Sequence, residues 1–307
     1  MFRYFATAAM SVAFIGWGMS SDHESRPADW RMNVGLTAGD HKKGVEEFSE
    51  DGLRMVDYEV YRMNRVNVHS SVWVEKESGA EWKFEKELPY REFEDKREEY
   101  ANKGFQLVEV EMGRIGAGLL FSGVWLKKEK GETTIFFMGM DELMFSNRYG
   151  EMADREYRLV DFETYEANGK LRYAGIWIRN NGMNPRFYRG LSKKDFLTVA
   201  AKLEGEGYRI IDVESYETED GQRFAAQWVK RLENQESRFA FDLLPDDYYQ
   251  KNTAYTEAGY RLIDFEVFAL GNQARYSGSW VRDQLNDEEK QEKKKESFLE
   301  VLRKGDQ

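Results

Sequence analysis

The feature that most constrains the fold is a set of five tryptophans at a nearly constant spacing. Successive members are 52, 52, 51 and 52 residues apart: Trp73, Trp125, Trp177, Trp228 and Trp280. A fixed period of this kind marks stacked copies of one supersecondary unit, in which neighbouring copies complete a shared core. We therefore expect one repeat domain over residues 29–283, built from units at about 29–75, 76–127, 128–179, 180–230 and 231–283.

Each unit has the pattern of a strand, a helix and a hairpin. In the fourth copy Ser192 is a helix N-cap type, and apolar residues follow at helical spacing as far as Leu203. In the third copy Asn168-Gly169 separates two β-rich runs, which predicts a two-residue hairpin turn. The helices should start near Thr37, Pro89, Asp141, Ser192 and Pro245. A glycine suited to a left-handed C′ position follows each helix except the third, where Glu156 takes its place.

The hairpin register predicts which residues share a face. A two-residue turn at Asn168-Gly169 sets Val160 opposite Trp177 and Asp161 opposite Ile176, so tryptophan and acid lie on opposite faces. The helices need an apolar surface to cover, and only the tryptophan face supplies one. We therefore expect the five tryptophans to be structural core of the repeat.

The opposite face is strongly acidic. Its ten carboxylates recur as one pair in each unit: Asp57, Glu59, Glu109, Glu111, Asp161, Glu163, Asp212, Glu214, Asp264 and Glu266. The bases that share this face are Arg172, Arg223 and Arg275. Its remaining members are small or polar: Ser70, Ser122, Ala174, Gln227, Ser277 and Ser279. The expected fold is α+β, with five β-α-β-β units in one curved antiparallel sheet, a half-barrel with helices on its outer face and acids on its concave face.

Two interpretations of the acids remain open. They form a structural ladder in which each acid pairs with Arg or Tyr of the same or the next unit, or they line a groove for a cationic or amide-rich polymer. Recurrence in every copy favours the ladder, whereas ten acids against three arginines favour the groove. The loop pattern of a calcium site is absent, and we predict no metal and no cofactor.

The repeat resembles a known family. Gly207-Tyr208-Arg209-Ile210 followed by an acid, and the closing run from Arg172 to Trp177, are similar to the tandem repeat at the amino end of polyglycine hydrolases and related bacterial β-lactamase-like proteins. The resemblance implies a helix-backed antiparallel half-barrel that recognises a substrate or partner beside a serine hydrolase domain. No serine here has a lysine three residues later, so the resemblance covers the repeats without the catalyst.

Composition removes several classes of chemistry. The chain has no cysteine, which excludes thiolate metal sites and cysteine nucleophiles, and its net charge of −11 disfavours binding to nucleic acid. Its three histidines, His23, His41 and His69, do not recur between units. We predict no catalytic residue, and whether the protein is an enzyme stays open, with a non-enzyme favoured.

The two ends differ from the repeats. Residues 1–21 hold one charge, Arg3, and an apolar run from Phe5 to Met19 that is too short to span a bilayer. We interpret them as a signal peptide, followed by a linker over 22–28; an apolar terminus without a targeting role is the alternative. The charge pattern of residues 284–307 predicts a charged helix or tail with one apolar stripe. The mature chain should be secreted or periplasmic, without a transmembrane span.

The functional prediction is a non-catalytic, exported repeat protein. Its concave acidic face would bind an extended peptide, a cell-surface polymer or a protein partner. The alternative is a hydrolase of unrecognised type that acts on a peptide or polysaccharide.

Overall fold

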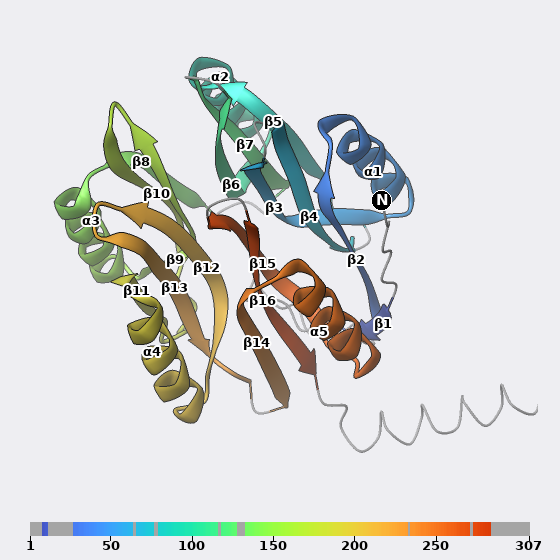
Figure 1. Cartoon of the computed structure of the whole chain (residues 1–307). Coiled ribbons are helices and arrows are strands. Elements are labelled where there is room, and N and C mark those ends of the chain that lie inside the picture. Colours follow the sequence, from blue (N-terminus) through green and yellow to red (C-terminus); the bar gives the residue numbers. More distant parts are fainter. Residues whose placement is uncertain are drawn as a thin grey trace, which may run out of the picture.

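The computed structural model describes residues 8–11, 27–63, 66–76, 79–115, 118–127, 133–232, 234–270 and 273–283 (Figure 1). Five units follow one another along the chain, each made of a strand, a helix and a two-stranded hairpin. The first strands are β2 (Pro27–Leu36), β5 (Trp82–Pro89), β8 (Thr134–Met140), β11 (Arg186–Leu191) and β14 (Gln235–Leu243). The helices are α1 (Ala38–Glu50), α2 (Tyr90–Asn102), α3 (Glu142–Asp154), α4 (Lys193–Gly205) and α5 (Pro245–Glu257).

Each hairpin has an inner and a middle strand. The inner strands are β3 (Leu53–Met63), β6 (Phe105–Ile115), β9 (Tyr157–Ala167), β12 (Tyr208–Thr218) and β15 (Arg261–Leu270). The middle strands are β4 (Val66–Glu75), β7 (Gly118–Lys127), β10 (Lys170–Arg179), β13 (Gly221–Lys230) and β16 (Gln273–Asp283). A further strand, β1 (Ala8–Ser11), pairs antiparallel with β2.

The strands form five separate antiparallel sheets, one in each unit. In every sheet the middle strand lies between the first strand and the inner strand, and β1 extends the sheet of the first unit. The prediction of β-α-β-β units is confirmed, but the prediction of one continuous sheet is wrong. Acid side chains bind backbone donors of the neighbouring inner strand, as in the contact of 2.7 Å from Phe265 N to Asp57 Oδ2. A ladder between these strands would need the same donors.

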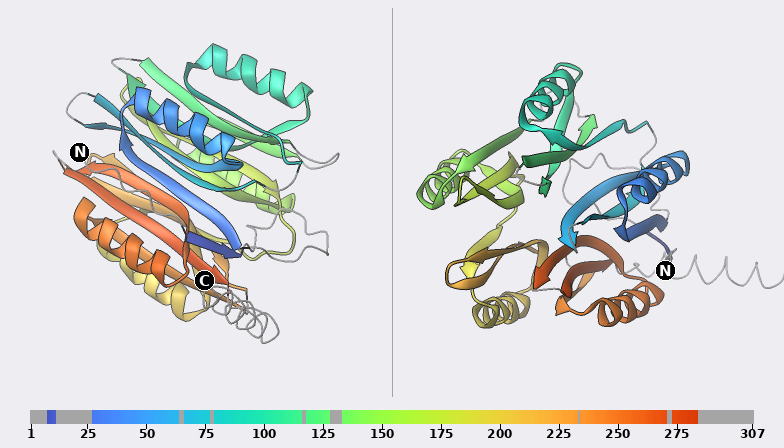
Figure 2. Two further views of the ribbon diagram at one scale, coloured as in Figure 1. Left: turned by 90° about the vertical axis from the view of Figure 1, so that its right-hand side faces the viewer. Right: turned by 45° about the horizontal axis from the view of Figure 1, so that its top comes forward.

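The five units are arranged around a common centre (Figure 2, right). Consecutive inner strands contact one another, and β15 of the last unit contacts β3 of the first. The hydroxyls of Tyr61 and Tyr276, from these two units, lie 3.2 Å apart. The predicted half-barrel is therefore not confirmed: Trp30 and Trp280 share one core cluster between the first and last units.

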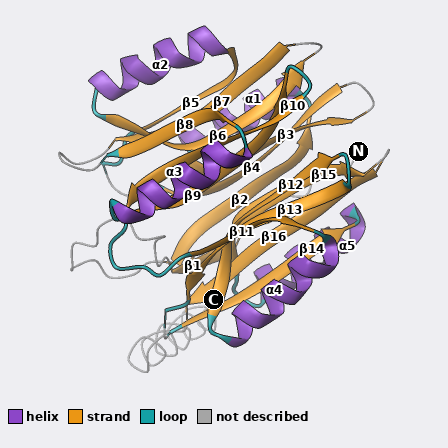
Figure 3. Cartoon of the chain, turned by 90° about the vertical axis from the view of Figure 1, so that its left-hand side faces the viewer, coloured by secondary structure: helices purple, strands orange, loops and turns teal. Residues whose placement is uncertain are grey.

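The helices lie on the outside of this arrangement, each over one face of its sheet (Figure 3). Ring contacts between the tryptophans and the helices identify this face as the tryptophan face. All five repeat tryptophans are 0–1% exposed. Each packs beside an aromatic residue of its unit's helix, as in Phe145 against Trp177 with ring centroids 6.0 Å apart. Gly175 is required at this contact, because a Cβ there would lie 2.8 Å from Leu159 Cδ1 and 2.9 Å from the Trp177 ring.

A β-bulge in every inner strand changes the predicted register. The hairpin pairs Lys170 with Ala167 and Ile176 with Asp161 as predicted, but Trp177 then lies opposite Leu159 because Val160 is unpaired. The expected pairing of Val160 with Trp177 is therefore wrong. Bulges stand at the same place in the other units, at Val56, Val108, Ile211 and Ile263. Because a bulge shifts the alternation by one residue, Arg158 faces the same side as Asp161.

The helix termini follow the sequence signals. Three side chains cap their helices by accepting a hydrogen bond from a backbone amide of the first turn. The pairs are Thr37 with Asp40 N, Asp141 with Met144 N, and Ser192 with Asp195 N. Pro89 is the N-cap of α2, and Pro245 is the first residue of α5. The glycines after four helices have φ between 80° and 85°, and Glu156 has φ 63° after α3.

Some predictions fall outside the described residues. They are the signal peptide apart from β1, the linker apart from Pro27 and Ala28, the C-terminal tail over 284–307, and His23. Within the part of the chain that the structure describes, none of the helices has both the length and the apolarity needed to cross a bilayer.

Candidate functional site

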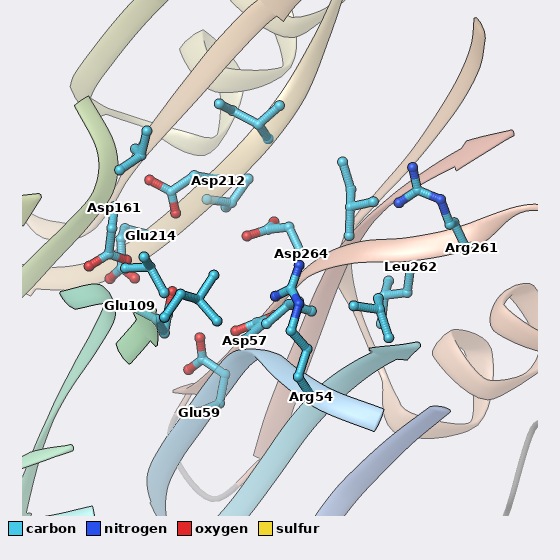
Figure 4. Close-up of a pocket in the computed structure, with 18 of the residues that line it drawn as sticks. Arg54, Asp57, Glu59, Glu109, Asp161, Asp212, Glu214, Arg261, Leu262 and Asp264 are labelled. Carbon is cyan, nitrogen blue, oxygen red and sulfur yellow. The ribbon is translucent and has the colours of Figure 1, made fainter. Parts of the chain in front are cut away.

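The inner strands surround a cavity at the centre of the molecule (Figure 4). Its volume is about 140 Å³, and all five units contribute to its wall. The bulge residues supply much of its apolar lining: Val56, Val108, Val160, Ile211 and Ile263. We call this space the central cavity. It is large enough for several water-sized groups or one small ligand.

The predicted acids converge on the central cavity. Eight of them line it: Asp57, Glu59, Glu109, Asp161, Glu163, Asp212, Glu214 and Asp264. The other two, Glu111 and Glu266, lie beside these and are 7% and 4% exposed. Six of the ten carboxyl residues are less than a tenth exposed, so this face is an interior and not the open concave groove that the sequence suggested.

Five of the acids join neighbouring units through backbone hydrogen bonds, and one of them is Asp264, which accepts from the backbone amide of Val213. Glu111 accepts from Val60 N at 3.3 Å, and Asp161 accepts from Val110 N at 3.2 Å. Glu266 accepts from Ser215 N at 3.0 Å, and Asp57 accepts from Phe265 N. These hydrogen bonds differ from the ladder predicted from the sequence. The partners of these acids are backbone amides of the next unit, whereas Arg or Tyr side chains were expected.

Other contacts join carboxyl to carboxyl. Hydrogen bonds connect Asp161 with Glu109, Glu111 with Glu163, and Glu266 with Glu59. Each of these pairs spans two units. An ionised carboxylate has no donor, so one member of each pair must carry a proton.

Burial raises the pKa of all ten carboxyls. It raises the pKa of Asp161 and of Glu266 to about 7. Burial together with the charge of Glu266 raises the pKa of Glu111 and of Asp264 to about 8. For the other six, burial and neighbouring acids hold the pKa well above its usual range: Asp57, Glu59, Glu109, Glu163, Asp212 and Glu214. Much of the cavity is therefore protonated at neutral pH.

Three of the acids have the spacing of cation ligands. Carboxylate oxygens of Glu59, Glu214 and Glu266 all lie within 4.8 Å of one another. Oxygen ligands at this separation suit a hard cation such as Ca²⁺, or an organic ammonium group. A search for a calcium loop in the sequence misses this set, because its members come from the first, fourth and fifth units.

The arginines of the site differ from those predicted. Arg172, Arg223 and Arg275 do not line the central cavity. Arg223 lies 3.9 Å from Asp220, Arg275 lies 3.7 Å from Asp242, and Arg172 donates to the carbonyl of Leu171. Arg54 and Arg261 line the cavity instead (Figure 4).

The signal for this second set was present in the sequence. Arginine recurs at one position of four units, and the second unit has glutamine there: Arg54, Gln106, Arg158, Arg209 and Arg261. Strict alternation placed these residues on the tryptophan face, and the bulge moves them to the acidic face.

The first unit contains a second buried polar cluster, which we call the histidine pair: His41 and His69. Both are 0% exposed, and their rings lie 5.6 Å apart. His41 Nε2 lies 3.1 Å from Ser71 Oγ, and the Tyr58 hydroxyl lies 2.7 Å from His69 Nδ1. Ser71 is 1% exposed and also accepts a hydrogen bond from Trp73 Nε1. This arrangement is a core network and does not present Ser71 to a substrate.

Comparison with known proteins places the repeats in a family. Comparison with curated proteins finds no match. The family described as polyglycine hydrolase-like, structural repeat, matches residues 27–76, 79–128, 137–180, 183–231 and 236–283. These matches span most of the chain and follow its five units. The protein therefore belongs to the polyglycine hydrolase-like structural repeat family.

Proposed function

We propose that the protein is a binding protein whose central cavity takes a small cationic ligand. The observation that carries this proposal is the convergence of eight carboxyls from five units on one cavity of about 140 Å³. A structural ladder needs one acid at each boundary between units, and five of the ten acids make the backbone hydrogen bonds described above. Glu59 and Glu214 line the cavity in addition to these.

The geometry favours a small ligand over an extended one. A peptide or polymer that lies along an acidic face contacts exposed carboxylates over a long groove. Here most of the carboxyls are buried around a central cavity, and Glu163 is only 5% exposed. A single ammonium group, a guanidinium group or a metal ion matches this enclosure better, because it needs few oxygens at close range.

Raised pKa values give the proposal a pH signature. A cation stabilises the ionised form of neighbouring carboxyls, so binding should release protons from groups such as Asp161, whose pKa is about 7 without ligand. Affinity should therefore rise with pH between about 5 and 8.

Titration calorimetry at pH 6 and pH 8 tests the proposal, with Ca²⁺, Mn²⁺, cadaverine and agmatine as probes. We expect at least one probe to bind about tenfold more tightly at pH 8, with proton release that shows as a dependence of the heat on the buffer. Glu59→Gln combined with Glu214→Gln should weaken binding by tenfold or more. Glu217→Gln is the matched control, because Glu217 is exposed on the same strand as Glu214. No binding by any probe at pH 8 would exclude this function.

We also propose that the protein is exported. The support is the apolar run from Phe5 to Met19 behind a single arginine. Expression of the full chain in a bacterial host, followed by intact mass measurement, checks this. Recovery outside the cytoplasm of a chain shortened by about 21 residues supports export, and recovery of only the full-length chain in the cytoplasm contradicts it.

A further inference from the structure

We propose that the ligand of the central cavity carries an anionic group beside its cationic one, as a free amino acid does. Arginines gathered next to the carboxyls would bind the anionic group. This inference rests on the proposed function and specifies the chemical class of the ligand.

The first observation is that the same cavity has basic and acidic walls. Arg54 and Arg261 line it together with Asp57 and Asp264, and Figure 4 shows the two guanidinium groups on the side of the cavity away from Asp161. The separation of charge is built by the fold. In each inner strand the bulge lies between the arginine position and the first acid, so both face inward at different heights along the strand.

The second observation is a buried arginine with open donors. Arg158 is 3% exposed, and its Nη1 and Nη2 have no hydrogen-bond partner among the described residues. Burial alone lowers its pKa to about 10, so the side chain stays charged at neutral pH. A charge buried without a partner is costly, and native proteins pair nearly all such groups.

Arg158 is not among the residues that line the cavity, but its register relates it to two arginines that do. It follows from the register that Arg158 lies on the inner face of β9, three residues before Asp161, as Arg54 and Arg261 precede Asp57 and Asp264. Its equivalents in the first and fifth units line the cavity. A guanidinium group binds a carboxylate with two parallel hydrogen bonds, which suits recognition of the carboxylate of an amino acid.

The second unit supplies a natural replacement. Gln106 stands where the other units have arginine, and its Oε1 accepts a hydrogen bond from Thr134 N at 2.9 Å. Glutamine is therefore compatible with this position of the fold. Arg158→Gln is the mildest variant that removes the charge.

The experiment compares two pairs of probes that differ in one carboxylate: lysine with cadaverine, and arginine with agmatine. Calorimetry at pH 8 on the full chain should show the amino acid of at least one pair binding tenfold or more tightly than its decarboxylated partner. In Arg158→Gln this preference should fall to about threefold or less, while the partner without the carboxylate binds as before. Arg179→Gln is the control, since Arg179 is two-thirds exposed and should leave the preference unchanged.

The outcomes separate the two proposals. Equal affinity within both pairs in the unmodified protein would overturn the amino-acid inference and leave the cationic cavity standing. The inference would also be overturned if none of the four compounds bound, or if Ca²⁺ or Mn²⁺ bound and none of the four compounds did. A preference for the amino acid that survives both Arg158→Gln and Arg54→Gln would show that the arginines do not bind the carboxylate. If Arg158→Gln fails to fold, the comparison within the unmodified protein and in Arg54→Gln still decides.

Discussion

The central cavity and the histidine pair both bury ionisable side chains, but they are built in different ways. Every unit supplies one or two carboxyls to the wall of the cavity, and several of the acids in and beside this wall hold the units together. The histidines belong to the first unit alone, where they replace aromatic residues of the other units. His41 corresponds to Phe93 and Phe145, and His69 corresponds to Phe121.

The two regions also respond to pH with opposite sign. Burial raises the pKa of the carboxyls, so the folded state keeps protons that the unfolded chain has lost. Their contribution to stability is complete below about pH 4 and is lost as pH rises to about 8. Burial, with the charge of Lys86, lowers the pKa of His41 to about 3 and of His69 to about 4. Their contribution is complete above about pH 6.5 and is lost as pH falls toward 3.

The largest expected effect tests the cavity. Without ligand, the melting temperature should fall by more than about 5 °C between pH 5 and pH 8.5. Replacing Glu59, Glu214 and Glu266 together by glutamine should remove at least half of that fall, because glutamine keeps hydrogen-bonding groups and does not ionise. Scanning calorimetry across this range gives the measurement. An unchanged slope would mean that these carboxyls are ionised in the folded protein, and Glu217→Gln should keep the original slope.

The next effect tests the histidine pair. The protein should lose melting temperature as pH falls from 6.5 to 4. Replacing His41, Tyr58 and His69 together by phenylalanine should reduce this loss by about 3 °C or more. The second and fourth units have phenylalanine at both histidine positions, so the variant exchanges a buried polar network for apolar side chains. It also removes the unpartnered His41 Nδ1 and His69 Nε2. The fall between pH 6.5 and 8.5 should not change, because the histidine contribution is already complete above about pH 6.5. If the change in melting temperature between pH 6.5 and pH 4 is the same as in the original protein, the histidines are not the source of acid sensitivity.

The sequence correctly predicts the features that recur from unit to unit. The tryptophan period, the β-α-β-β unit and the Asn168-Gly169 turn are local patterns, and they specify correctly that Asp161 and Trp177 lie on opposite faces. The bulge at Val160 is not visible locally, because an unpaired valine looks like any other strand residue. The error it introduces moves Arg158 to the wrong face.

The arrangement of the units is decided by contacts that no local pattern records. The bond from Phe265 N to Asp57 joins residues 208 positions apart. The contacts of His41 with Ser71, 30 residues away, also depend on the packing of α1 over its sheet. The sequence predicted that acids would gather on one face, but whether that face is open or enclosed depends on how the last unit meets the first.

A third prediction tests the packing that supports the inner strands in both regions. Gly175→Ala should destabilise the protein by about 1–3 kcal/mol, because the new methyl group would overlap Leu159 and Trp177. The first unit has Ser71 at this place, so its core already accommodates a side chain. Gly150→Ala is the matched control: it lies within α3 with no atom within 4 Å of its Cβ position and should stabilise by up to about 1 kcal/mol. Chemical denaturation measures both variants. An unchanged free energy of unfolding in Gly175→Ala would show that the surrounding side chains can move to accommodate the methyl group.

The smallest effect concerns a position outside both regions. Glu156 has φ 63° where four other units have glycine, and a residue with a Cβ pays about 1–2 kcal/mol there. Glu156→Gly should relieve this strain, but the glycine also increases the entropy of the unfolded chain, which offsets part of the gain. The net stabilisation should therefore be about 0.5–1 kcal/mol. The lost ion pair with Arg179 is exposed and contributes little. Gly207→Ala, which imposes the same strain on the fourth unit, should destabilise by a similar amount or more. Because neither position touches the cavity or the histidine pair, both variants should shift the melting temperature equally at pH 4 and pH 8.5. A shift that depends on pH would show that the two regions are coupled to the helix ends.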